Sequence, residues 1–507
     1  GDWSSDVCSS DLVRPLGAEG GKYMVAPIYP STKGDGDGRH YGIVCPVTLA
    51  SVGDAYTEDI FIRPSVQNQA LEADVTVRNT SGRARTLRVR CEAVNDRSGE
   101  VEQTFGPVDV TCPAKATAMA TVRGGWTDPK LWWPVPDPDL YRLRTTILDD
   151  ETVVDTQEEL FGFREVTVKG TGIYINGMRR NLWCWVNAGT PYGASADEWA
   201  RTFREEGNRC TRFSRNRKIS RNLPTREGRL EFFDRNGIAG RLCSMIDGMR
   251  ISYHLGDRER TEDGEPKFVP FEPVWESFRR HIAQLTKAYR NHPSVIFYQI
   301  ENELVYINGM NRFQGYLEDI EREMMEVYLA GYANDPTRPY SVGGGGDLRH
   351  ARGMDRKLEI NSPHYPRGNI DFYPENAYTL ERYSRKITRW PWTRQQPWVV
   401  GESAHASELT MGSYVSGADA YKSKDDVDRA KAKFLRMMYG GYRWTGVAGF
   451  FPWDNLSEYE DGQKIFSDLI AIPRKQTWRL AGGRENRLLY KVMNDTLSRE
   501  PVEFAWH

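Results

Sequence analysis

The chain has 507 residues, more than one ordinary hydrophobic core accommodates, so roughly two to four domains are expected. It carries 68 Lys plus Arg against 70 Asp plus Glu, a formal net charge of −2. This balance gives neither the basic surface of a nucleic-acid-binding protein nor an acidic tail. No window approaches the run of about 18 apolar residues that a membrane-spanning helix needs.

The seven cysteines are scattered, with no C-x-x-C pair and no cysteine–histidine cluster, which argues against a disulfide framework and a structural zinc. Aromatic residues are abundant at 12%, with 15 Trp and 25 Tyr. Flat aromatic rings stack on sugar faces, but large hydrophobic cores use them too, so the composition is compatible with carbohydrate binding and does not establish it.

The first twelve residues resemble one reading frame of a sequencing-adapter oligonucleotide, so we expect residues 1–12 to be non-native and Cys8 not to be a native cysteine. We therefore expect the native N-terminus to be missing, which leaves the localisation unknown. Residues 13–59 contain one convincing strand pattern, at 41–49, and we interpret them as the remnant of an N-terminal jelly-roll β-sandwich that binds sugar.

Residues 60–163 show the period-2 alternation of half-buried strands, with turn sequences such as Asn-Thr-Ser-Gly at 79–82 between them. Regular short strands over about 100 residues predict an immunoglobulin-like β-sandwich. Trp126 and the Leu-Trp-Trp-Pro sequence at 131–134 could form a sugar platform. We favour instead an aromatic corner that packs the sandwich against its neighbour.

From residue 164 to residue 486 strand patterns alternate with helical patterns. A first strand is expected at 181–186, and Ser195 with Glu198 three residues later forms a capping box at a helix start. Further helices are expected around 278–289, 316–332 and 430–439, and strands at 340–342 and 447–453. This alternation predicts a closed (β/α)₈ (TIM) barrel more readily than a doubly wound sheet. Residues 487–507 are interpreted as the start of a truncated C-terminal β-sandwich.

Two of the predicted barrel strands end in carboxylates. The apolar run at 294–300 is followed by Glu301, Asn302 and Glu303, and the run at 398–400 is followed by Glu402. The carboxyl ends of barrel strands form the active-site face of this fold. Two carboxylates there are the minimum needed to cleave a glycosidic bond, one as proton donor and one as nucleophile or base. Of the two glutamates at this strand end, Glu301 is the weaker candidate for the acid.

The chain resembles glycoside hydrolase family 2, which includes β-galactosidases, β-glucuronidases and β-mannosidases. The resemblance rests on the sequences Phe-Gly-Phe-Arg at 161–164, Ile-Asn-Gly at 175–177, Asn-His-Pro at 291–293, Asn-Glu at 302–303, Asp-Pro-Thr-Arg-Pro at 335–339 and Glu-Ser-Ala-His-Ala at 402–406. It implies that Glu303 is the acid/base and Glu402 the nucleophile of a retaining mechanism. Retention is expected if the two carboxyl groups lie ~5–5.5 Å apart.

The resemblance also implies residues that bind the substrate or orient the glutamates. Arg212 resembles an arginine that pairs with the nucleophile, although several arginines crowd around it. Asn302 is placed to donate a hydrogen bond to a sugar hydroxyl. The remaining candidates for the substrate-binding pocket are Tyr365, His364, Trp453, His405 and Asp247; for His364, His405 and Asp247 a purely structural role weighs equally.

We therefore expect a retaining exo-β-glycosidase, most similar to a β-galactosidase, that acts on an oligosaccharide or glycoside. β-Glucuronidase or β-mannosidase specificity and an inactive carbohydrate-binding protein are the alternatives. The sequence departs from bacterial β-galactosidases after Arg212 and around Asp247. No matching ligand set for magnesium is found, so neither a metal nor another cofactor is predicted. No nucleic-acid partner is expected, and self-association into a homo-oligomer is left open.

Overall fold

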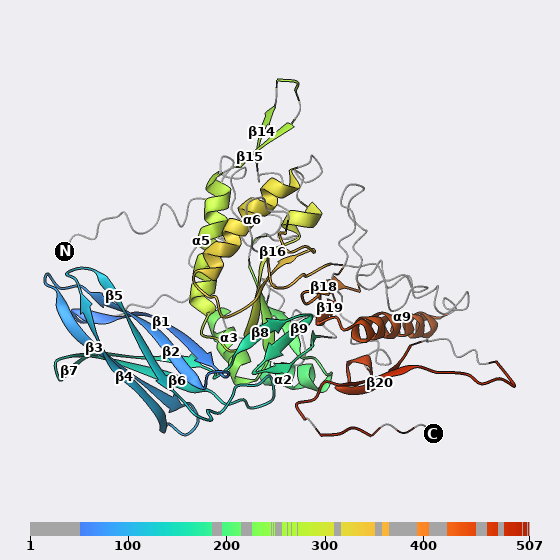
Figure 1. Ribbon diagram of the computed structural model, residues 1–507, viewed down its shortest axis with the longest axis horizontal. Coiled ribbons are helices and arrows are strands. Elements are labelled where there is room, and N and C mark those ends of the chain that lie inside the picture. Colours follow the sequence, from blue (N-terminus) through green and yellow to red (C-terminus); the bar gives the residue numbers. More distant parts are fainter. Residues whose placement is uncertain are drawn as a thin grey trace.

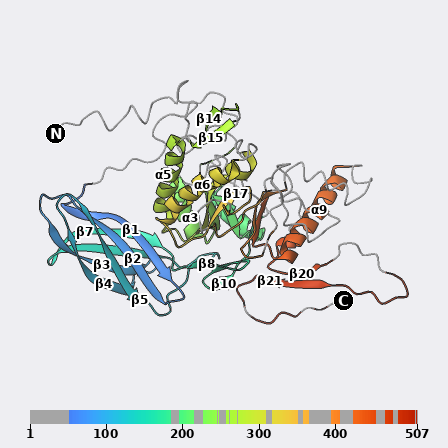
Figure 2. The ribbon, with the colours of Figure 1, turned by 45° about the horizontal axis from the view of Figure 1, so that its top comes forward.

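The computed structural model describes residues 51–184, 195–213, 226–244, 246, 248, 256–260, 262–264, 266–270, 272–308, 316–349, 357–364, 392, 394–404, 423–452, 464–474, 481–498, 500–503 and 505. The predicted strand at 41–49 and residues 13–50 of the predicted N-terminal remnant lie outside these residues, as do residues 506 and 507 of the predicted C-terminal domain. Figure 1 and Figure 2 show a β-sandwich on one side of a mixed α/β body, with a C-terminal hairpin on the other side.

The first seven strands form two antiparallel sheets. One sheet has the order β1-β2-β5 and the other β4-β3-β6-β7. The bounds are β1 (Ala55–Ser65), β2 (Ala70–Asn79), β3 (Arg85–Asn95), β4 (Val101–Cys112), β5 (Thr117–Gly125), β6 (Tyr141–Asp149) and β7 (Thr152–Phe161). The alternation predicted from the sequence is present in β2, where every second residue from Leu71 to Val77 is buried. These residues face one shared core between the sheets.

Trp126 is part of this core and is not a sugar platform. Its side chain is buried, and its ring packs edge-on against the rings of Tyr141 and Phe163 at centroid distances of 4.8 and 5.3 Å. Trp132, six residues later, belongs to the core of the α/β body, and its indole nitrogen donates to the Asp234 carbonyl at 2.9 Å. The aromatic corner therefore joins the sandwich to its neighbour, as predicted.

The link between sandwich and body is a small antiparallel sheet of β8 (Val166–Lys169), β9 (Gly172–Ile175) and β10 (Met178–Arg179). Asn176 turns the chain between β9 and β10 in the left-handed region, at φ 51°. Its side chain accepts from the backbone N–H of Glu165 and donates to the Trp132 carbonyl, both at 2.9 Å. Gly162 lies so close to Trp132 and Pro293 that a Cβ would come within 2.7–2.8 Å of their side chains. These contacts explain the glycine of the 161–164 sequence and the Asn-Gly of the 175–177 turn.

In the part of the body that the structure describes, seven parallel strands form two sheets, ordered β12-β13-β16-β17 and β11-β19-β18. Their bounds are β11 (Leu182–Trp183), β12 (Cys210–Phe213), β13 (Ala239–Cys243), β16 (Val295–Asn302), β17 (Tyr340–Gly343), β18 (Val399–Ser403) and β19 (Gly449–Pro452). The first sheet meets the second through the Arg209 N–H, which donates to the Trp183 carbonyl at 2.8 Å. Residues 360–364 bridge the other edges: Ile360 N–H donates to Tyr340 and Val399 N–H to Asn361.

Helices follow most of these strands along the chain and lie outside them (Figure 1). Their bounds are α2 (Ala196–Glu205), α3 (Arg226–Arg235), α5 (Glu272–Tyr289), α6 (Leu317–Tyr332) and α9 (Lys424–Thr445), with the short helices η5 (Leu304–Asn308) and η10 (Lys464–Phe466). Ser195 caps α2 by accepting from the Glu198 N–H at 3.1 Å, as the capping box predicts. Helix α9 begins six residues before the predicted 430, because Ser423 caps a first turn whose charged residues carry no apolar periodicity.

The described C-terminal residues pack against the body. β21 (Tyr490–Asn494) pairs antiparallel with β20 (Leu469–Pro473). Asp495, just after β21, binds Asn181 at 2.7 Å and Arg443 at 2.7 Å through its carboxylate. The predicted strand near 490 is therefore present, while the domain boundary at 487 stays a prediction. A second hairpin, β14 (Gly256–Arg260) and β15 (Pro266–Pro270), projects from the opposite end of the body in Figure 1.

His292 makes the stability of this fold pH-dependent. Its Nδ1 lies 2.5 Å from Oδ2 of Asp234, whose other oxygen accepts from the Ser294 N–H at 3.0 Å. Burial alone would lower the pKa of His292, but the Asp234 carboxylate outweighs burial and the pKa is raised. Because the pKa is raised in the folded state, the protonated ring stabilises the fold, and this stabilisation is fully present when the pH is below the ordinary pKa of histidine, about 6.5. It is lost as the pH rises through the pKa of the folded state.

We therefore expect the free energy of unfolding to fall as the pH is raised from about 6 to about 8, and this part of the pH dependence to disappear in His292→Gln. Denaturant unfolding at a series of pH values measures it. An identical pH dependence in the variant and the parent would contradict the role given to this pair.

Candidate active site

Glu303 lies directly after β16, the strand that ends at Asn302. Seven of the eight residues of β16 are buried, so the end of the strand is held rigidly in the core. Glu303 itself has a φ of 55°, unusual for a residue with a side chain, and its N–H donates to the Gly343 carbonyl at 2.9 Å. The strand thus stops abruptly and leaves the Glu303 carboxyl at its C-terminal end, with 14% of the side chain exposed.

Glu402 occupies the matching position in β18, with 5% of its side chain exposed. Gly401 precedes it, and a Cβ there would come within 2.6 Å of the Ser362 hydroxyl and 2.7 Å of the His364 ring. Glycine therefore lets residues 362–364 pack directly against β18, where His364 and Glu402 form a parallel β-bridge.

The two glutamates converge around His364, which is fully buried. The His364 Nδ1 lies 2.9 Å from Glu303 Oε1 and 3.5 Å from Glu402 Oε2. One oxygen of each glutamate and a ring nitrogen of His364 all lie within 4.8 Å of one another. The carboxylates predicted from two separate strand ends are thus brought together.

Arg212, on β12, lies against both glutamate-bearing strands. One guanidinium nitrogen is ion-paired with Glu402, and the other donates to the Asn302 side-chain oxygen at 2.5 Å. Burial alone would lower the pKa of Arg212, but Cys243 and the Glu402 carboxylate outweigh burial and raise it. The arginine is therefore a permanent cation that holds the Glu402 carboxylate ionised and fixes the orientation of the Asn302 amide.

Two further polar residues support this arrangement and were not among the predicted site residues. Arg241 on β13 is fully buried; it donates to the Gln299 side chain at 2.7 Å and to the Gly401 carbonyl. Gln299 donates in turn to the Glu301 carbonyl at 3.0 Å. Burial, with the nearby Arg212 cation, lowers the pKa of Arg241 to about 10. An arginine and a glutamine inside otherwise apolar strands were the sequence signal for this network.

Glu301 has a different role from its neighbour. It is 1% exposed, and its carboxylate accepts from the Leu304 N–H at 2.5 Å. The side chain thus fixes the turn from β16 into η5, which agrees with its interpretation as a supporting residue. Four predicted site residues, Asp247, Tyr365, His405 and Trp453, lie outside the described residues.

Among the described residues, Glu303, His364 and Glu402 form the one group of three side chains whose ligand atoms are close enough to share a metal ion. The Arg212 guanidinium already neutralises Glu402 within this group. A second cation at the same carboxylate would be repelled by the arginine at close range, so the charge distribution disfavours a metal here.

Removal of the Arg212 charge should impair both stability and any chemistry at Glu402. Arg212→Met leaves the Glu402 carboxylate buried without its partner, and breaking a buried pair in this way costs about 3–5 kcal/mol. We expect unfolding at lower denaturant concentration and at least a roughly 100-fold loss of glycoside hydrolysis. Arg212→Lys keeps the charge but cannot bind Glu402 and Asn302 together, so it should restore stability more than activity. Equal activity in the parent and Arg212→Met would contradict this role.

The model of glycosyl hydrolases family 2 matches residues 55–164, which are the sandwich and the start of the link to the body. The β-galactosidase of Vibrio vulnificus strain YJ016 is 22% identical over 450 residues, 84% of this chain and 37% of that protein. The β-galactosidase of Alteromonas mediterranea is 23% identical over 430 residues, 80% of this chain and 35% of that protein. The sandwich at residues 55–164 therefore matches glycosyl hydrolases family 2.

Solved structures of family 2 share the fold. A Bacteroides uniformis β-glucuronidase 2 superimposes with a TM-score of 0.53 and 18% identity, over 80% of this chain and 47% of that chain. A β-galacturonidase from Eisenbergiella tayi gives a TM-score of 0.55 and 15% identity, over 82% of this chain and 72% of that chain. The chain thus has the multidomain fold of family 2 glycoside hydrolases. It spans little more than a third of the length of the β-galactosidases that it matches.

Proposed function

We propose that this chain carries the catalytic centre of a retaining exo-acting β-glycosidase, with β-galactosides as the first expected substrates. The observation that carries the proposal is that one carboxylate oxygen of Glu303 and one of Glu402 lie within 4.8 Å of each other, at the C-terminal ends of two parallel strands. Retaining glycosidases hold their two carboxyl groups ~5–5.5 Å apart, and inverting enzymes ~6.5–9.5 Å.

A closed (β/α)₈ barrel is part of this proposal. The hydrogen bond between Arg209 and Trp183 at one pair of sheet edges supports closure. At the other edges residues 360–364 supply an eighth strand-like segment that bonds to β17 and to β18. In such a barrel both glutamates lie on the face formed by the C-terminal ends of the strands, where the active sites of this fold are found. The domain boundaries at 60, 164 and 487 belong to the same proposal.

In the first step the Glu303 carboxyl donates its proton to the glycosidic oxygen while a Glu402 carboxylate oxygen attacks the anomeric carbon. The bond between that carbon and the leaving oxygen breaks, the aglycone departs as an alcohol, and the sugar stays attached to Glu402 as an ester. In the second step Glu303, now a carboxylate, takes a proton from water. The water oxygen attacks the anomeric carbon and the ester bond to Glu402 breaks, so the β configuration is restored after two inversions.

Arg212 and His364 would help to give the two glutamates their different roles. Arg212 holds Glu402 as an anion, which a nucleophile must be. The Nδ1 atom of His364 lies close to a carboxyl oxygen of each glutamate, so the ring fixes the separation of the two carboxyl groups. It can form a hydrogen bond with either group as the protonation of Glu303 changes during the reaction. The sequence left a pocket-lining and a structural role for His364 equally weighted, and its full burial favours a positioning role. Asn302, whose side-chain oxygen is held by Arg212, has its amide N–H groups directed by that contact and can donate to a sugar hydroxyl.

β-Glucuronidase specificity is the second candidate, and β-mannosidase specificity the third. The sequence relatives include β-galactosidases and a putative β-glucuronidase of Formosa agariphila, and the structural neighbours include β-glucuronidases and a β-galacturonidase. An enzyme for uronic acids needs a cation that faces the sugar carboxylate, and Arg212 is already committed to Glu402 and Asn302. A carbohydrate-binding protein without activity is a further alternative, which the convergence of Glu303 and Glu402 argues against.

A panel of p-nitrophenyl β-glycosides tests the substrate class. We expect the highest kcat/KM on the β-galactoside and none on α-glycosides. A preference for the β-glucuronide or β-mannoside would replace the substrate assignment and leave the mechanism intact. Binding of a glycoside without any turnover would favour the inactive carbohydrate-binding alternative.

In the described part of the chain no helix is both long and apolar enough to cross a membrane.

A further inference from the structure

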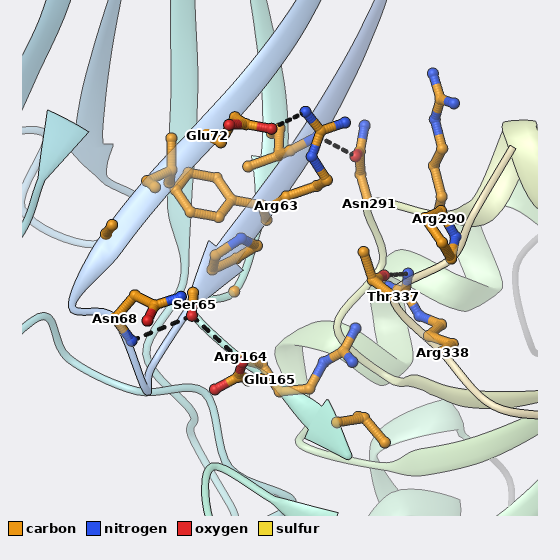
Figure 3. Close-up of a pocket in the computed structure, with 18 of the residues that line it drawn as sticks. Arg63, Ser65, Asn68, Glu72, Arg164, Glu165, Arg290, Asn291, Thr337 and Arg338 are labelled. Atoms are coloured by element: carbon orange, nitrogen blue, oxygen red, sulfur yellow. Dashed lines mark hydrogen bonds and ion pairs between the residues drawn. The ribbon is translucent and has the colours of Figure 1, made fainter. Parts of the chain in front are cut away.

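A cavity of about 490 Å³ lies between the sandwich and the α/β body, away from the glutamates. It is lined by the end of β1 and the start of β2, by the link at residues 161–166, and by the loops that precede β16 and β17 (Figure 3). Those loops enter their strands, whereas Glu303 follows β16. Since a strand rises about 3.3 Å per residue, the eight residues of β16 separate the cavity from the glutamates by roughly 25 Å.

Arginines dominate the polar lining, and all but one of them have acidic partners. Arg63 is bound to Asp74 and Glu72, Arg290 to Asp59, and Arg338 to Asp335 at 2.6 Å. Arg123 reaches Glu72 at 2.9 Å. The carboxylates of the lining are engaged as well: Glu165, for example, accepts from the Gln67 N–H at 2.9 Å.

Arg164 is the exception. Its side chain extends from the link toward Thr337 and Arg338 (Figure 3) and is 6% exposed. Within the described part of the chain its guanidinium makes no hydrogen bond and no ion pair, and its Nε is a buried donor without an acceptor. Buried guanidinium groups are costly unless they are paired, because each N–H loses its water and gains nothing in exchange. The structure therefore keeps a cation in a cavity where the other charges are already matched.

We propose that this cavity is a binding site for a small oxyanion, a carboxylate or phosphate group held by the Arg164 guanidinium. A guanidinium presents two parallel N–H donors that match the two oxygens of either group. The cavity is large enough for a sugar acid or a sugar phosphate, since small-molecule sites begin at roughly 300 Å³. Ser65 and Thr337, which also line the cavity, offer hydroxyl groups for the rest of such a ligand.

The electrostatics of the cavity support this. Burial, with added repulsion from the Arg338 cation, lowers the pKa of Arg164 well below its usual range. A bound oxyanion would remove both penalties, since an opposite charge within hydrogen-bonding distance favours the charged form. Because Arg164 comes from the link and Arg338 from the body, a ligand here would also tie the sandwich to the body. The proposal does not depend on the function proposed for Glu303 and Glu402.

Calorimetric titration of the whole chain with phosphate, D-glucuronate and galactose, at an ionic strength held constant with sodium chloride, tests the site. We expect saturable one-to-one binding of phosphate, of glucuronate or of both, and the two arms identify which oxyanion is preferred. Galactose serves as the neutral control for this site. Arg164→Met should weaken the binding by about tenfold or more, since a hydrogen bond to a charged group is worth that much. Arg88→Gln, at an exposed ion-paired arginine of the sandwich, should leave it unchanged.

Glucuronate can also enter a glycosidase active site, but such binding would survive in Arg164→Met. Binding that is equal in the parent and Arg164→Met, or no saturable binding of either anion, would overturn the proposal. If Arg164→Met does not fold, crystals of the unaltered protein grown with selenate decide the matter. An anomalous peak within hydrogen-bonding distance of Arg164 supports the site, and a cavity without one refutes it.

Discussion

Replacement of Glu402 by alanine is expected to lower kcat for a nitrophenyl β-glycoside by about 10⁴-fold or more, because the covalent intermediate can no longer form. The side chain is 5% exposed and belongs to β18, all of whose residues are buried. The cavity left by the shortened side chain should admit a small anion. Azide is then expected to restore part of the activity and to yield an α-glycosyl azide, since only one inversion occurs.

The matched control for this variant is Glu276→Ala, at an exposed glutamate of α5, which should retain the parent's kcat and stability. Glu402→Ala also leaves the Arg212 cation buried without its partner, so unfolding has to be measured beside activity. Undiminished turnover in a folded Glu402→Ala variant would remove Glu402 from the mechanism.

Replacement of Glu303 by alanine is expected to lower the rate of glycoside cleavage by a factor that depends on the leaving group. General acid catalysis contributes about 10²–10⁴-fold, and the contribution is largest where the departing oxygen is basic. We therefore expect near-normal formation of the glycosyl-enzyme with a dinitrophenyl glycoside and a severe loss with an alkyl glycoside. Azide should accelerate the second step of this variant and yield a β-glycosyl azide, the opposite anomer from that of Glu402→Ala.

Glu301→Gln is the control that separates the two neighbouring glutamates. Glutamine keeps an oxygen that can accept from the Leu304 N–H, so we expect less than about a tenfold change in kcat. A dependence on the leaving group in Glu301→Gln, with none in Glu303→Ala, would exchange the roles assigned to these residues.

The parts of the fold that could be predicted are those in which local pattern and tertiary packing agree. The alternation from Leu71 to Val77, the Ser195 cap and the buried run of β16 all appear in the structure where the sequence placed them. Strand ends were equally readable, because an apolar run that stops at a carboxylate marks a boundary between the core and a polar site. This is why both glutamates could be singled out before their distance was known.

Apart from the pairing of Arg212 with Glu402, which the resemblance implied, the supporting contacts could not be predicted, because they depend on which strands become neighbours. Nothing local indicates that Arg241 reaches the Gly401 carbonyl 160 positions away or that His364 lies between the two glutamates. Several of the short sequences that suggested the family form contacts between the sandwich and the body and take no part in the chemistry. Asn291, for example, accepts from the Ile62 N–H at 3.0 Å and donates to the Ile60 carbonyl at 2.8 Å.

The central claim is that Glu402 becomes covalently attached to the sugar, and mass spectrometry of the inactivated protein tests it most directly. A 2-deoxy-2-fluoro β-glycosyl fluoride of the best substrate should label the chain once. The 2-fluorine slows both steps by destabilising their oxocarbenium-like transition states, while the good fluoride leaving group keeps the first step fast enough for the intermediate to accumulate. We expect the added mass on the peptide that contains Glu402, and its disappearance in Glu402→Ala. A label on Glu303 or elsewhere, or continued turnover of substrate with no label on the chain, would contradict the account.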